Sequence, residues 1–169
     1  MQETLVSVSL LALLMIILPA LFCGGIIALI ERKTPHRVSA QATGSTWLLG
    51  TAAAIVSLLI SAFVLGLLPR AVNNEDIVAF ALPIILIILL PVGARFAHHQ
   101  IAGPLGLALG GAVGCALYYC VDTLITGLGD GSGLWSLGIL YAWVFCGIPL
   151  LVVAILYSAI TRNRAPQRA

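Results

Sequence analysis

The fold depends on one stretch of sequence, GPLGLALGGAVGCALYYCVD, which runs from Gly103 to Asp122. Gly106, Gly110 and Gly114 are four residues apart in this apolar run. The pattern is compatible with a flexible loop, but it also makes the small-residue face of a membrane helix that packs closely on another helix. Whether this run crosses a membrane decides the number of spans, and therefore the side on which the chain ends.

The composition indicates a membrane protein. Hydrophobic residues make up 61% of the 169 residues and charged residues only 8%, whereas soluble domains average about a quarter charged. Five runs contain no charged residue, and they cover residues 5–30, 47–68, 77–94, 101–121 and 134–160. Each run reaches the length of about 17–25 residues that a helix needs to cross about 30 Å of hydrocarbon, whereas a barrel strand needs only about half of that.

The segments outside these runs are too short to fold as a domain, since the longest of them, 31–46, has 16 residues. We therefore predict an all-α bundle that forms a single integral membrane domain over residues 1–169. The first run is predicted to be a true span rather than a cleaved signal peptide. The four residues before it, MQET, contain no Lys or Arg, and the run exceeds the usual length of about 7–15 apolar residues.

The basic residues predict the orientation, because short cationic loops stay in the cytoplasm. With five spans and the N-terminus outside, seven of the eight basic residues are cytoplasmic and only Arg70 is outside. If the stretch 103–122 did not cross, they would divide four to four. We therefore expect five spans in a bacterial cytoplasmic membrane, with the C-terminus inside. The seven cytoplasmic residues are Arg32, Lys33, Arg37, Arg95, Arg162, Arg164 and Arg168.

The glycines of the fourth run form a strip that we predict to be a helix-packing interface. In lipid, helices associate through close backbone approach, dispersion and a few hydrogen bonds. Three partners for this glycine strip stay open: another helix of the same chain, a second chain, or a lipid or small ligand. The glycine strip consists of Gly103, Gly106, Gly110, Gly111 and Gly114.

No run has a charge near its midpoint, which argues against an ion pump with a carboxylate relay inside the membrane. Asp122 comes nearest to an exception, at the outer end of the fourth run and one turn beyond Tyr118. It is either an interfacial carboxylate in water or part of an outer polar site, with Tyr118 or Tyr119 donating a hydrogen bond. A carboxylate near a helix C-terminus opposes the helix dipole, which is an argument for the polar site.

A second group of polar residues is expected at the cytoplasmic face, where the first loops are short. Neighbouring His98 and His99 would point about 100° apart on a helix and do not easily share a metal ion. A metal site would need one of them together with His36 and Glu31. We expect contacts with water or lipid headgroups instead, and no metal or cofactor. The group consists of Glu31, His36, Arg95, His98 and His99.

All four cysteines, Cys23, Cys115, Cys120 and Cys146, lie inside the apolar runs. Cys115 and Cys120 are about 140° apart around a helix, so a disulfide between them would break helical geometry. We therefore expect the cysteines to have a packing role.

Two resemblances to known families can be stated. The sequence GLGD, from Gly127 to Asp130, matches the GxGD pattern of intramembrane aspartyl peptidases, which need two carboxylates sharing one site. In that family the second aspartate comes from a separate helix far upstream, whereas here the nearby candidate is Asp122, so we predict a turn at GLGDGSG. The run GPLGLALGG followed by Asp122 is similar in composition to glycine-rich helices of vitamin-binding subunits of ECF transporters, which implies solute binding.

The sequence favours a non-enzymatic function. We expect an accessory, assembly or regulatory subunit that binds another membrane protein or a second copy of itself through Gly106, Gly110 and Gly114. The alternative is a small-solute transporter or channel that works as an oligomer, with kinks at Pro19 and Pro149 and an entrance at Asp122. An intramembrane enzyme is the third reading. Catalytic residues and a nucleic-acid partner are not expected, and the bilayer is the surrounding solvent.

Overall fold

The structure is a computed structural model that describes residues 2–33, 45–67, 75–97, 99–126 and 134–163. Side chains are described at residues 10, 14–33, 45–66, 80–97, 99–122, 125 and 137–161. These residues form helices: α1 (Gln2–Lys33), α2 (Thr46–Ser61), η1 (Ala62–Leu67), α4 (Glu75–Ala94), α5 (Ala102–Thr126), α6 (Leu134–Tyr141), η2 (Ala142–Gly147) and α7 (Ile148–Asn163). The two η segments are π-helical turns, and they continue α2 and join α6 to α7.

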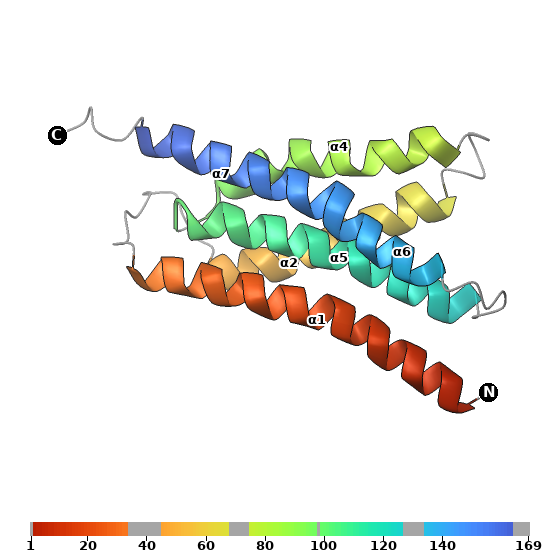
Figure 1. Ribbon diagram of the computed structural model, residues 1–169. Coiled ribbons are helices and arrows are strands. Elements are labelled where there is room, and N and C mark those ends of the chain that lie inside the picture. The colour runs from red at the N-terminus through yellow and green to blue at the C-terminus, as the bar shows by residue number, and fades with distance from the viewer. Residues whose placement is uncertain (1, 34–44, 68–74, 98, 127–133, 164–169) are drawn as a thin grey trace.

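The helices make long rods that run in alternating directions along one axis (Figure 1). The rods are α1, α2–η1, α4, α5 and α6–η2–α7, and the start of α1 and the end of α7 lie at opposite ends of the bundle (Figure 1). The bounds of the helices agree closely with the five apolar runs. For example, α1 covers Gln2–Lys33 where the sequence places a span at 5–30. The all-α prediction is therefore confirmed.

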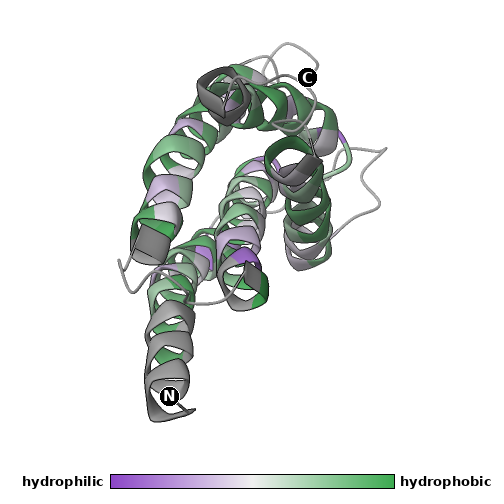
Figure 2. Cartoon of the chain, turned by 90° about the vertical axis from the view of Figure 1, so that its right-hand side faces the viewer, coloured by the Kyte–Doolittle hydropathy of each residue, from purple (hydrophilic) through white to green (hydrophobic). Residues whose placement is uncertain are grey.

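Four of the described helices are long and apolar enough to cross a membrane: Leu14–Lys33, Thr46–Gly66, Ala102–Asp122 and Leu137–Thr161. The fifth expected span corresponds to α4, whose apolar part Phe80–Ala94 is shorter. Most residues along the rods are hydrophobic, as Figure 2 shows, and many large hydrophobic side chains are exposed, with Phe22 at 71%. Such a surface is stable in lipid and not in water, so this is a membrane protein.

Helix α5 lies at the centre of the bundle and contacts α1, α2, α4, α6, η2 and α7. Within its span, 56% of the residues are buried, against 17% in the spans of α1 and α2. Leu82, Cys115 and Ile139 are among the side chains completely enclosed around it. The stretch 103–122, which decides the fold, is therefore a helix in the core and not a loop.

Both π-helical turns stand two residues before a proline, in the similar sequences AFVLGLLP and AWVFCGIP. A proline has no N–H and its ring collides with the carbonyl four residues earlier. At η2 the chain accommodates Pro149 by widening the turn, and the N–H of Ile148 bonds to the carbonyl of Trp143, five residues back. Helix α1, in contrast, passes Pro19 without a change of helix type.

Candidate functional site

The glycine strip of α5 faces α2. A Cβ atom added at Gly106 would stand 3.0 Å from the carbonyl oxygen of Thr46, and one at Gly110 would collide with the carbonyl oxygen of Gly50. A Cβ atom at Gly114 would collide with Ser57 and with the backbone of Ala54. The two helices therefore approach with backbone against backbone, which is possible only where a side chain is absent.

The other two members of the strip contact different elements. A Cβ atom at Gly103 would collide with Ala97, which lies in the turn before α5. One at Gly111 would stand 3.0 Å from the side chain of Leu150 in α7. All five glycines are buried inside this chain. Of the three partners that the sequence left open, the structure places helices of the same chain against the strip.

Buried hydrogen bonds join α2 and α5 beside the glycine strip. The Ser57 hydroxyl donates to the carbonyl of Gly111 at 2.9 Å, and also contacts the carbonyl of Ala54 at 3.2 Å. The Ser61 hydroxyl lies 2.7 Å from the carbonyl of Ser57 and 3.5 Å from Sγ of Cys115. Because neither water nor lipid can satisfy polar groups at this depth, these contacts fix how α2 docks on α5.

The four cysteines are free thiols. Cys115 of α5 and Cys146 of η2 are both completely buried, and their side chains are within hydrogen-bonding contact. In the sequence, Cys115 and Cys120 are the pair on one helix, and nothing there indicates this contact between helices. No local signal could have shown it, since it depends on how η2 packs against α5.

Aromatic side chains gather at the end of α5 where the sequence predicts an outer polar site. The ring centroids of Tyr118 and Tyr119 are 5.7 Å apart, and Tyr119 lies 6.1 Å from Tyr141 in α6. Tyr141 stacks on Phe145 at 4.8 Å. Asp122 is exposed, one turn beyond these rings. The arrangement is an aromatic edge for the bundle, and Gly138 lets α6 approach the ring of Tyr119.

Two of the residues predicted at the cytoplasmic face, Glu31 and His99, take part in separate hydrogen bonds. The Thr46 hydroxyl donates to the Glu31 carboxylate at 3.1 Å and so ties the end of α1 to the start of α2. Nδ1 of His99 accepts from the N–H groups of Ala102 at 2.9 Å and Ile101 at 3.2 Å, which caps α5. Arg95 is exposed. His36 and His98 lie outside the described residues, as does the GLGD sequence.

Among the described residues, no three His, Cys, Asp or Glu side chains come close enough to hold a metal ion. Glu31 and His99 are used by hydrogen bonds that belong to the fold. What this face does chemically, as far as it is described, is to fasten helix ends.

A cavity formed by the described helices is a groove with a volume of about 910 Å³ between α1 and the α6–η2–α7 rod, with α5 as its floor. This lateral groove is open on one side, and its volume is in the range of about 300–1,000 Å³ that is usual for ligand pockets. It forms because α1 diverges from the other rods toward its N-terminal end (Figure 1). The groove is bounded by Leu14, Cys23 and Ile30 of α1, by Ala108 of α5, and by Trp143 and Ile155 of the α6–η2–α7 rod.

Two features of the lateral groove are unusual for a purely apolar surface. The indole Nε1 of Trp143 is buried, and it has no hydrogen-bond partner within the part of the chain that the structure describes. Pro19 also lines the groove and has no N–H for the carbonyl of Met15, another lining residue. The sequence does not predict this groove, since its one signal there is Pro19, which equally indicates a kink.

No family model, curated protein or solved structure matches this chain.

Proposed function

We propose that this protein is a non-enzymatic accessory, assembly or regulatory subunit that binds the helix of another membrane protein on the outside of α1. The glycine strip is covered by α2, Ala97 and Leu150 of the same chain, so the proposed partner surface lies on a different helix from the one that the sequence favoured. The observation that carries this proposal is the surroundings of Gly25. Of the glycines that the structure describes, Gly25 is the one whose added Cβ atom would meet nothing within 4 Å.

Gly25 has a cost and no compensating contact with the part of the chain that the structure describes. A glycine inside a helix is less favourable than alanine by about 0.5–1 kcal/mol, so a packing role usually accompanies it. Leu21, Phe22 and Leu29 surround Gly25 on the helix surface, and all three are exposed. Large side chains around a missing one make a notch that the backbone of a second helix can enter. We call Leu21, Phe22, Gly25 and Leu29 the α1 outer face.

The number of membrane crossings and the orientation of the chain are part of the same proposal. The chain crosses a bacterial cytoplasmic membrane five times, with α4 as the third span, the N-terminus outside and the C-terminus in the cytoplasm. The distribution of basic residues supports this orientation. The start of α1 and the end of α7 lie at opposite ends of the bundle, which supports an odd number of crossings (Figure 1).

The proposal is tested by Gly25→Leu in the full chain, purified from native membranes in a mild detergent. The expected result is loss of a stoichiometric partner, or of a second copy, from the native mass of the complex, while the melting temperature of the isolated chain is not lowered. Ala52→Leu is the matched control, because Ala52 is an exposed small residue on α2. If both variants keep the native mass of the wild type, the α1 outer face is not the interface.

The transporter alternative gives a different result. Purified protein reconstituted alone in liposomes should show no solute flux above that of empty liposomes. Measured flux that Asp122→Asn abolishes would replace the accessory function with transport through the outer mouth.

A further inference from the structure

We propose that the lateral groove binds one anionic phospholipid, with its acyl chains over α5 and its phosphate beside Lys33. This site lies on the inner side of α1 and is separate from the α1 outer face, so it does not depend on a protein partner. Three observations carry it: the apolar lining of the groove, the positive charge near one end of it, and the hydrogen bond that the neighbouring Glu31 carboxylate makes with Thr46.

The lining of the lateral groove selects hydrocarbon. Leu14, Ile30 and Ile155 are typical of its walls, and Ala108 of its floor. A polar solute that entered would lose its hydrogen bonds to water, at a cost of several kcal/mol for each unpaired group. A flexible acyl chain loses none, and it can follow a floor that alternates small and large side chains. The groove therefore suits a lipid chain and not a polar metabolite.

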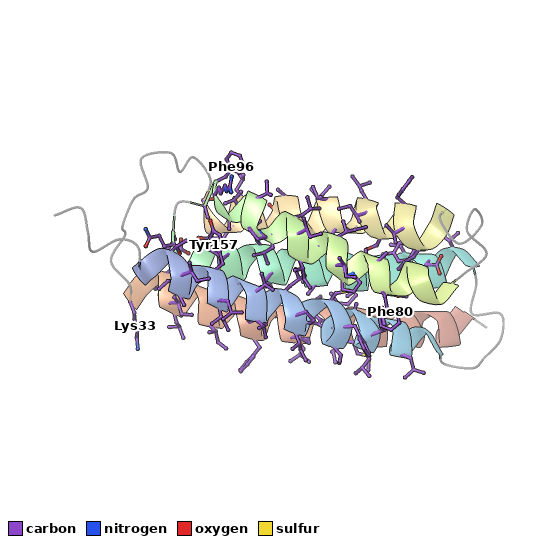
Figure 3. All side chains as sticks on the ribbon, turned by 90° about the horizontal axis from the view of Figure 1, so that it is seen from above. Lys33, Phe80, Phe96 and Tyr157 are labelled. Carbon is purple, nitrogen blue, oxygen red and sulfur yellow. The ribbon has the colours of Figure 1, made fainter. Side chains whose placement is uncertain are left out.

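One end of the groove is positively charged. Lys33 follows Ile30 by three residues and Ile26 by seven, so it continues the α1 face that lines the groove. Its side chain is exposed and extends away from the bundle at the end of α1 (Figure 3). Arg32 adds a second cation at the same helix end. A lysine at the end of a membrane helix can reach the phosphate layer, and so the headgroup of a lipid whose acyl chains lie in the groove.

The nearest carboxylate does not neutralise this charge. Glu31 precedes Lys33 by two residues, which places it on a different side of α1, and it accepts the hydrogen bond of the Thr46 hydroxyl at 3.1 Å. Within the described part of the chain, no ion pair involves Lys33. The end of the groove thus presents a cation whose natural complement in a bilayer is an anionic headgroup.

Trp143 provides the measurement, because it lines the groove. A variant with Trp47→Phe and Trp135→Phe keeps Trp143 as the one tryptophan of the chain. Its fluorescence is measured in liposomes that contain acyl-brominated phosphatidylglycerol or acyl-brominated phosphatidylcholine at equal mole fractions. Bromine quenches indole on contact. We expect phosphatidylglycerol to associate about five-fold more strongly, which corresponds to the roughly 1 kcal/mol of one basic residue near anionic lipid.

The controls separate headgroup recognition from groove filling. Lys33→Gln should reduce the preference for phosphatidylglycerol to about one, whereas Arg95→Gln should keep it, since the exposed Arg95 follows α4, a helix that contributes no residue to the groove. Cys23→Phe fills the groove and should weaken quenching by both lipids, whereas Ile55→Phe on the exposed side of α2 should not.

Two outcomes overturn the proposal. Equal quenching by the two lipids would mean that the groove holds only bulk lipid. An absence of quenching by either lipid would mean that no lipid enters the groove, as when a second copy or a partner helix fills it. Neither result bears on Gly25, so a failure here leaves the proposed function standing, and a failure at Gly25 leaves this site standing.

Discussion

Gly110 of α5 and Gly25 of α1 both lie inside apolar helices, but their surroundings are opposite. A Cβ atom at Gly110 would collide with the backbone of α2, and one at Gly25 would meet nothing that the structure describes within 4 Å. The helices differ in the same way, with 56% of the α5 span buried and 17% of the α1 span. In lipid, where apolar surface does not drive helices together, glycine content alone therefore does not show which helix has its partner inside the chain.

The largest effect is expected from Gly110→Leu. The side chain would have to enter the space of the Gly50 carbonyl, which belongs to a hydrogen-bonded helix and cannot move aside. Ordinary overpacking of a core costs about 1–3 kcal/mol, and separating two helices costs more. We expect no monodisperse protein in size-exclusion chromatography, whereas Gly25→Leu should still elute as a single symmetric peak of folded protein. Equal elution of the two variants would remove the distinction between the two helices.

Most of the helices could be predicted from the sequence, because the length of an apolar run nearly determines where a membrane helix begins and ends. The glycine strip was also recognised, but its partner was not. A signal was available: Thr46, Gly50, Ala54, Ser57 and Ser61 give α2 a matching row of small residues at helical spacing. The two rows could have been paired by their spacing, since each helix needs a small-residue face for close approach.

Other features depend on packing and leave little trace in the sequence. The contact between Cys115 and Cys146 joins residues 31 positions apart, and nothing near either cysteine indicates it. The lateral groove results from the divergence of α1, which neighbouring helices and lipid set together. The polar group predicted at the cytoplasmic face was based only on the short loops that would hold its residues close together. In the structure, Glu31 is bonded to α2 and His99 to the start of α5.

A medium effect is expected at the polar contacts that hold α5. Ser57→Ala removes a buried hydroxyl that bonds to the Gly111 carbonyl at 2.9 Å, and it should lower the free energy of unfolding by about 1 kcal/mol, as interhelical hydrogen bonds in membranes do. The measurement is the unfolding midpoint in mixed detergent micelles. Thr51→Ala is the control, because that exposed hydroxyl bonds within its own helix to the Leu48 carbonyl at 2.9 Å. A larger loss for Thr51→Ala would mean that the α2–α5 contact is not what limits stability.

The smallest effect has the opposite sign, and it is the sharpest test of the comparison. Gly25→Ala should stabilise the isolated chain by about 0.5 kcal/mol, because alanine is the better helix former and its methyl group enters open space. Gly114→Ala should destabilise it, since the same methyl group collides with Ser57. Unfolding midpoints of the two variants report both signs. If a partner helix enters the notch at Gly25, then Gly25→Ala must weaken the complex while it strengthens the free chain, and packing within a single chain cannot produce that reversal.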